Sequence, residues 1–259
     1  MSAELKATRH DATLILTLSN PGRRNALHPD MAAAAIETLS TAERDDTLRT
    51  VVLTGADEYF CAGGDLRRLI ENRAQPKSVQ AASLDQLHGW IEAIRACPKP
   101  VIVAVEGGAA GAGFSLALAC DFFVASRSAQ FTMSYVNVGL TPDGGGSWLL
   151  SQALPRAFAT ELLMSGKAVG AERLHQLGLI NRLANDGNAL DTALQLADEL
   201  ARHSPHALEG IKNLLRDAAG ATLPDHLQSE KHCFVESLHH RDANEGINAF
   251  LEKRSPNYR

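Results

Sequence analysis

The 259-residue chain lacks an excess of positive charge: it has 25 lysines and arginines against 30 aspartates and glutamates, and a formal net charge of −5. Binding to nucleic-acid phosphates requires a basic surface, so we expect no nucleic-acid partner. No segment stays apolar over the roughly 18 residues that a membrane-spanning helix needs. The first residues also lack a basic region followed by an apolar stretch and a cleavage site. We therefore expect a cytoplasmic protein without a membrane partner.

Paired cysteines and metal-binding motifs are also missing. The cysteines lie far apart and form no CxxC motif: Cys61, Cys97, Cys120 and Cys233. Most of them lie beside apolar residues, which favours buried, reduced thiols over disulfides or metal ligands. The histidines are not spaced as metal ligands with nearby acids or thiols. We interpret them as surface or interface residues and predict no metal site.

Short apolar runs that end at turn residues predict strands in much of the chain. We predict strands at residues 12–19, 49–55, 99–108, 121–126 and 179–184. Helix-forming segments lie between them, and strands that alternate with helices predict an α/β fold with crossover connections. Residues 72–83 are polar and include a proline, so we interpret them as a mobile connection.

The last part of the chain has a different pattern. From about residue 200, helix-forming segments follow one another to the end. We therefore divide the chain into an α/β core at residues 1–200 and a helical region at residues 201–259. A helical region appended to an α/β core needs a surface to cover, and a second copy of the chain would supply one.

Two segments repeat the order of apolar strand, glycine-containing loop and helix start: VVLTGADEYFCAGGDL (51–66) and VIVAVEGGAAGAGFSL (101–116). Glycine permits positive φ angles and lets a ligand approach the main chain. Two such loops together can form an oxyanion hole, in which backbone N–H groups stabilise a developing negative charge. For one loop alone, tight packing of a helix on a sheet is the simpler explanation. A phosphate-binding loop is not indicated, because neither GxxxxGKS/T nor GxGxxG is matched.

Both loops, together with AQFTMSYVNVGLTPDGGGSWLL (129–150), resemble the crotonase (enoyl-CoA hydratase/isomerase) superfamily. Further similar segments are PGRRNAL (21–27), ELLMSGKAVGAERLHQLGLINRL (161–183) and AFLEKRSPNY (249–258). The resemblance covers nearly the whole chain. It implies a ClpP/crotonase-like spiral of ββα units and a C-terminal helical trimerisation region. It also implies homotrimers or dimers of trimers that bind acyl-CoA thioesters, with coenzyme A as part of the substrate and no further cofactor.

The resemblance assigns the two oxyanion donors to the backbone N–H groups of Gly64 and Ala112. Ala112 occupies the middle of what is usually a run of three glycines, and this substitution leaves the N–H group intact. A thioester carbonyl held by two such donors can delocalise charge as an enolate, which makes its α-proton removable by a modest base.

The base cannot be the pair of glutamates that hydratases of this superfamily use. Ser115 and Tyr135 occupy the matching positions, and neither is a carboxylate. The remaining carboxylate in this region is Asp143, where some isomerases of the superfamily carry their catalytic acid. The sequence GLTPDGGGSWLL around it, together with VEGGAAGAG, is most similar to the phenylacetate-pathway ring-epoxide acyl-CoA isomerases. One carboxylate suffices for a double-bond shift, because it can take a proton from one carbon and return it to another.

Each of these three side chains also has a simpler interpretation. Asp143 follows a proline and precedes GGGSWLL, where it can act as the N-cap of a helix. Ser115 follows a glycine loop but does not complete the GxSxG motif, so a buried helix serine bonded to a carbonyl is favoured over a nucleophile. Tyr135 can line the acyl pocket, donate a hydrogen bond, or simply pack.

The resemblance also implies contacts with the substrate. Arg23 and Arg24 precede the NAL turn at a position where the superfamily places a phosphate-contacting base, and arginines elsewhere are usually just solvated. The remaining positions predicted to bind substrate, besides Ser115 and Tyr135, are Ala26, Ala62, Asp65, Leu66, Phe234 and Lys253. The last two match positions that reach the adenosine end of coenzyme A, Lys253 often from a neighbouring subunit.

The residues and the resemblance together predict an acyl-CoA enzyme that stabilises a thioester enolate and moves a proton, as an enoyl-CoA isomerase. Three alternatives remain open. The first is an enoyl-CoA hydratase that works with a single carboxylate. The second is an acyl-CoA hydrolase or dehalogenase in which Asp143 is the nucleophile. The third is a non-catalytic subunit that binds coenzyme A, since both usual glutamates are absent.

Overall fold

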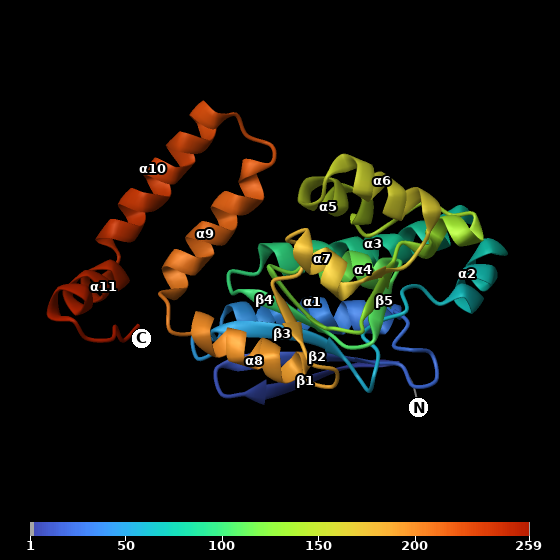
Figure 1. The fold of residues 1–259 in the computed structure, drawn as a ribbon, viewed down its shortest axis with the longest axis horizontal. Coiled ribbons are helices and arrows are strands. Elements are labelled where there is room, and N and C mark those ends of the chain that lie inside the picture. Colours follow the sequence, from blue (N-terminus) through green and yellow to red (C-terminus); the bar gives the residue numbers. More distant parts are fainter. Residues whose placement is uncertain (1–2, 259) are drawn as a thin grey trace.

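The computed structural model describes residues 3–258. Its larger sheet has the strand order β1–β2–β3–β4–β6–β9 (Figure 1). The bounds are Glu4–His10, Thr13–Ser19, Thr50–Gly55, Val101–Val105, Phe122–Ser126 and Arg182–Ala184. β1 pairs with β2 in antiparallel orientation, and the other neighbours are parallel. The five predicted strands are confirmed, each with a later start, and the one predicted at 99–108 ends at Val105. β1 was not predicted, because it is a largely exposed edge strand without an apolar run.

A second, smaller sheet contains β5 (Gly108–Ala110), β7 (Gln130–Thr132) and β8 (Val169–Gly170). An isolated bridge joins Cys61 to Ala109 and extends this sheet by one position. A strand of the larger sheet is thus followed by a short strand or bridge, and then by a helix, as in β4, β5 and α4 (Ala112–Leu118). This repetition confirms the predicted spiral of ββα units.

The parallel strands are apolar on both faces, because helices cover both faces (Figure 1). Val51 and Leu53 point to the main core, which includes residues of α1 (Pro29–Glu43) and α3 (Lys77–Ala96). Val52, between them, points to the opposite face, which α8 (Ala189–Leu200) covers. The helices between β7 and β9 are η1 (Ser134–Val138), α5 (Gly146–Ala153), α6 (Arg156–Ser165) and α7 (Ala171–Gln176).

The interpretation of residues 72–83 as a connection is wrong. α2 spans Leu66–Arg73 and α3 begins at Lys77, so only residues 74–76 join the two helices. Pro76 is the N-cap of α3, a place where its fixed φ angle and missing N–H cost nothing. The segment is polar because much of its helical surface faces solvent and, as described below, because part of it faces a pocket.

The predicted C-terminal helices are confirmed as α9 (Pro205–Ala218), α10 (Leu223–His239) and α11 (Arg241–Glu252). α9 and α10 extend away from the α/β core (Figure 1). The ammonium of Lys212, near the middle of α9, donates to the carbonyls of Ile94 and Lys99 and to the Asp121 carboxylate. Within residues 3–258, no helix has the length and apolar character needed to cross a membrane.

Candidate active site

The two glycine-containing loops lie against each other. The Ala110 N–H donates to the Cys61 carbonyl at 2.9 Å, and the Cys61 N–H donates to the Gly108 carbonyl at 3.4 Å. Gly63 has a φ of +85°, and a Cβ atom there would lie 2.5 Å from the Ala110 carbonyl oxygen. A Cβ atom at Gly113 would lie 2.6 Å from the Cys61 carbonyl oxygen. Side chains are absent because the two main chains touch at these points.

This contact places two unused backbone donors in one pocket. Gly64 follows Gly63, and Ala112 is the first residue of α4, whose N-cap Gly111 provides no side-chain cap. Within residues 3–258, neither the Gly64 nor the Ala112 N–H group has a hydrogen-bond acceptor. Both residues line the same pocket of about 860 Å³. A ligand oxygen is the partner that such donors lack.

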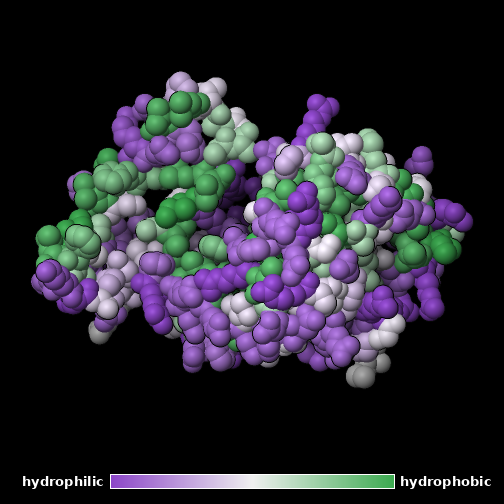
Figure 2. Space-filling view, viewed as in Figure 1, coloured by the Kyte–Doolittle hydropathy of each residue, from purple (hydrophilic) through white to green (hydrophobic). Residues whose placement is uncertain are grey.

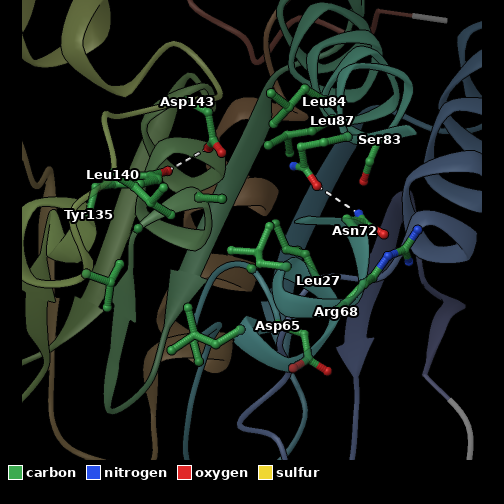
Figure 3. A pocket seen from close by; sticks show the side chains of 18 of the residues that line it. Leu27, Asp65, Arg68, Asn72, Ser83, Leu84, Leu87, Tyr135, Leu140 and Asp143 are labelled. Atoms are coloured by element: carbon green, nitrogen blue, oxygen red, sulfur yellow. Dashed lines mark hydrogen bonds between the residues drawn. The ribbon is translucent and has the colours of Figure 1, made fainter. Parts of the chain in front are cut away.

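Four parts of the chain line the pocket (Figure 3). They are the glycine loops, the helices α2 and α3, residues 134–143, and the segment from Leu27 to Ala32 at the start of α1. The pocket brings together these sequence-predicted site residues: Ala62, Gly64, Asp65, Leu66, Ala112, Tyr135 and Asp143. Candidate donors and a candidate acid therefore meet in one cavity, although they are distant in the sequence.

Asp143 presents its carboxyl group to the pocket rather than to a helix. The N-cap of α5 is Gly145, without a side-chain cap, so the capping interpretation of Asp143 is wrong. Its Oδ1 accepts a hydrogen bond of 2.6 Å from the Tyr135 hydroxyl (Figure 3). Burial raises the pKa of Asp143 above its usual range, and the bond from Tyr135 and the charge of His88 partly oppose this rise. A raised pKa brings a carboxyl closer to the range useful for proton transfer at neutral pH.

The two residues at the glutamate positions support Asp143. Burial, and next the Asp143 carboxylate, raise the pKa of Tyr135, so its hydroxyl stays protonated and acts as a donor. Ser115 is fully buried and does not line the pocket. Its hydroxyl lies 3.0 Å from the backbone carbonyl of Asp143 and 3.5 Å from that of Gly111. One side chain thus fixes the carboxyl of Asp143 and the other fixes its backbone.

The predicted contacts with coenzyme A are not gathered at the pocket. Arg23 forms an ion pair with Asp65, Arg24 lies over the Tyr59 ring, and Ala26 is buried. None of Arg23, Arg24 and Ala26 lines the cavity. Phe234 on α10 is 69% exposed, and Lys253 ends α11; neither lines the pocket of its own chain.

The wall made by α2 and α3 was missed in the sequence. It contributes Arg68, Asn72, Gln80, Ser83, Leu84 and Leu87, among others. The spacing of Ser83, Leu84 and Leu87 is typical of one face of a helix, but the polar composition of residues 72–83 equally fits a connection. Within the described part of the chain, no group of three or more potential metal ligands occurs.

Comparisons with known proteins identify the family and the fold of the chain. Residues 8–259 match the enoyl-CoA hydratase/isomerase family. The chain is 39% identical to the 1,2-epoxyphenylacetyl-CoA isomerase of Escherichia coli K12, over 95% of this chain and 94% of the relative. It is 35% identical to the 2,3-dehydroadipyl-CoA hydratase of the same strain, over 99% of each chain.

A solved structure described as an enoyl-CoA hydratase from Polaromonas sp. JS666 superposes with a TM-score of 0.98. It is 55% identical to this chain and covers 99% of it, and the match covers 100% of that structure. The resemblance noted in the sequence is thereby confirmed over the whole fold, including the crotonase spiral. The chain belongs to the enoyl-CoA hydratase/isomerase family of the crotonase superfamily and is an enzyme that acts on acyl-CoA thioesters.

Proposed function

We propose that the chain is an enoyl-CoA isomerase that shifts a double bond by way of a thioester enolate. The observation that supports this proposal is that the Asp143 carboxyl lines the same pocket as the N–H groups of Gly64 and Ala112, which lack hydrogen-bond acceptors among the described residues. In the proposed complex these two N–H groups donate to the thioester carbonyl oxygen. Each such donor stabilises the oxyanion by about 3 to 4 kcal/mol in comparable enzymes.

The proposed reaction moves one proton. An ionised Asp143 removes a proton from C2 of a 3-enoyl-CoA, and the electron pair of the C–H bond moves toward the carbonyl oxygen. The resulting dienolate takes the proton back at C4, so the double bond shifts to C2–C3 and Asp143 is ionised again. Tyr135 occupies Oδ1, which leaves Oδ2 as the atom that carries the proton. No electron is gained or lost, so the proposed step needs no cofactor besides the coenzyme A of the substrate.

The hydratase alternative is favoured less by the same geometry. Syn addition of water requires one group to activate the water and another to deliver a proton. Ser115 and Tyr135 occupy the positions of the two glutamates of hydratases. The Ser115 hydroxyl lies within hydrogen-bond distance of backbone carbonyl oxygens, and the Tyr135 hydroxyl stays protonated because its pKa is raised. The relatives include enzymes named as an isomerase and as a hydratase, so their names support either activity.

The proposal is tested directly by incubating wild-type enzyme with 3-enoyl-CoAs and, separately, with the 2-enoyl-CoAs that a hydratase would use, in heavy water enriched in ¹⁸O. From 3-enoyl-CoA we expect 2-enoyl-CoA without ¹⁸O, and with deuterium at C2 or C4 in those turnovers in which the proton on Asp143 exchanges with solvent before it is returned, as measured by mass spectrometry. Accumulation of 3-hydroxyacyl-CoA labelled with ¹⁸O would favour a hydratase. Free carboxylic acid, or a trapped acyl group on Asp143, would favour the hydrolase or dehalogenase. Binding of the thioesters with neither a product nor any label would favour a non-catalytic subunit.

The Tyr135 hydroxyl should set the pH dependence of this reaction. It donates to the ionised form of Asp143 and so lowers the pKa of that carboxyl. Tyr135→Phe removes the bond, the pKa of Asp143 rises further, and the acid limb of kcat/KM therefore moves to higher pH. Isomerisation rates measured from pH 4 to 9 check this, with Tyr59→Phe, outside the pocket, as the control. An acid limb that stays in place or moves to lower pH would contradict it.

We also propose that α9–α11 pack against other copies of the chain, in a homotrimer or a dimer of trimers. These helices leave large apolar side chains exposed, visible as the green surface over them in Figure 2. They include Ile211, Leu215, Leu223, Phe234, Phe250 and Leu251. Exposed apolar surface of this extent on neighbouring helices is typical of an interface. A sedimentation mass equal to one chain would rule the assembly out.

A further inference from the structure

The α2–α3 side of the pocket contains a set of half-buried polar side chains, here called the polar wall: Arg68, Asn72, Gln80 and Ser83. Arg68 and Asn72 are four residues apart and so lie on one face of α2. The Asn72 amide donates to Gln80 Oε1 at 2.7 Å and thereby joins α2 to α3 (Figure 3). The wall is therefore a fixed part of the pocket.

Arg68 carries a charge that no acid of the described chain balances. Within residues 3–258, it has no ion-pair or hydrogen-bond partner. Two acids lie three residues from Arg68 along the chain, Asp65 and Glu71. Asp65 is engaged by Arg23 and also accepts from the Arg67 N–H as the helix cap. Among the described residues, Glu71 forms no ion pair with Arg68. A guanidinium that is half removed from water and unpaired gains most from a carboxylate or phosphate, which it can bind through two parallel hydrogen bonds.

The polar wall lies apart from the proposed site of proton transfer. Figure 3 shows Arg68, Asn72 and Ser83 on one side of the pocket, and Tyr135 and Asp143 on the other. Leu27, Leu84 and Leu87 lie between the two groups. Leucines along this path favour the methylene groups of an acyl chain, whereas the amide-rich arm of coenzyme A would lose hydrogen bonds to water there.

We propose that the polar wall binds a carboxylate at the far end of the acyl group, with Arg68 as its anion-binding residue. The preferred ligands are then acyl-CoAs derived from dicarboxylic acids, a few methylene groups long. Asn72, Gln80 and Ser83 supply hydrogen-bonding groups around the same carboxylate. This inference rests on the proposed function in one respect: it takes the thioester to lie at Gly64 and Ala112.

The test compares the binding of saturated acyl-CoAs, which cannot isomerise. Pairs of four, six and eight carbons that end in a methyl group or in a carboxylate are titrated by calorimetry. We expect wild type to prefer the carboxylate member of at least one pair by about tenfold or more, the usual strength of a charge-assisted hydrogen bond. Arg68→Met should abolish this preference, and Arg68→Lys should keep part of it because it keeps the charge.

Arg67→Met is the matched control, because Arg67 is an exposed arginine on the same helix that does not line the pocket. It should leave the ratio of the two affinities unchanged. Asp143→Asn should also leave it unchanged, so failure of the isomerase proposal would not hide this result. If wild type prefers the methyl member, or if Arg68→Met weakens both members and free coenzyme A equally, the carboxylate proposal is overturned. The second outcome would assign Arg68 to a phosphate of coenzyme A.

Discussion

Asp143→Asn is expected to slow deuterium exchange at the acyl carbons by about a hundredfold to ten-thousandfold, the usual contribution of a general base. The amide of asparagine cannot accept a proton from carbon at neutral pH, yet it has nearly the shape of the carboxyl group. Its oxygen can still accept the hydrogen bond from Tyr135, so the pocket keeps its form. Thioester binding should therefore persist, measured with saturated acyl-CoAs, while exchange in heavy water is lost.

Asp85→Asn is the matched control for this loss. Asp85 is an exposed aspartate on α3 and does not line the pocket, so its removal should leave exchange within about twofold of wild type. If Asp143→Asn exchanges deuterium as fast as wild type, Asp143 is not the base. In that case the non-catalytic interpretation gains support only if wild type is also inactive.

Asp143→Asn should also stabilise the folded chain at pH values above the usual pKa of aspartate. Burial raises the pKa of Asp143 in the folded state, so the folded chain binds this proton more tightly than the unfolded chain. Wild type therefore loses stability as pH rises from the ordinary aspartate pKa to the raised one. Asparagine has no such loss. We expect Asp143→Asn to unfold at a higher temperature than wild type at pH 8, as measured by calorimetry, and to show no such gain near pH 3.5.

Gly63→Ala should produce a large loss of stability at the contact between the two glycine loops. The left-handed φ of +85° is unfavourable for alanine, and its Cβ would lie 2.5 Å from the Ala110 carbonyl oxygen, which belongs to the main chain and cannot rotate away. Backbone strain and overpacking together should cost about 2 to 5 kcal/mol, measured by urea unfolding. The surviving folded protein should also bind thioesters poorly, because the clash separates the loops that carry Gly64 and Ala112.

Gly64→Ala provides the control at the very next residue. A Cβ atom at Gly64 would meet no other atom within 4 Å, and its φ angle is not in the left-handed region. We expect its free energy of unfolding to stay within about 0.5 kcal/mol of wild type, since surface-like positions behave in this way. Equal losses at both glycines would show that the close contact between the loops is not what makes glycine necessary at position 63.

The parallel strands could be predicted because their signal is local. Val51 to Leu53 and Val101 to Val105 are unbroken apolar runs, which only a strand covered on both faces would bury so fully. β1 could not be predicted in this way, because its residues are mostly exposed and it is a strand only through pairing with β2. The short strands β5, β7 and β8 likewise exist through their partners.

The glycine loops, the absence of glutamates at positions 115 and 135, and the carboxyl at position 143 could be read directly from the sequence. The direction in which the Asp143 carboxyl points could not be predicted, because an acid before GGGSWLL can either cap a helix or face a pocket. Contact with Tyr135, eight residues away, decided it. The role of the segment around Asn72 and Gln80 was also hidden, because a polar helix surface and a loop have similar compositions.

The sequence by itself determined which groups are available, namely two glycine loops and the acid Asp143, and it showed a resemblance to acyl-CoA enzymes. Only the tertiary structure decided which of them meet. The physical reason is that each local pattern depends on neighbours along the chain, whereas a pocket depends on main-chain contacts between segments some 50 residues apart, such as Cys61 and Ala110. The packing of α2 against α3 then set the charge and shape of the far wall.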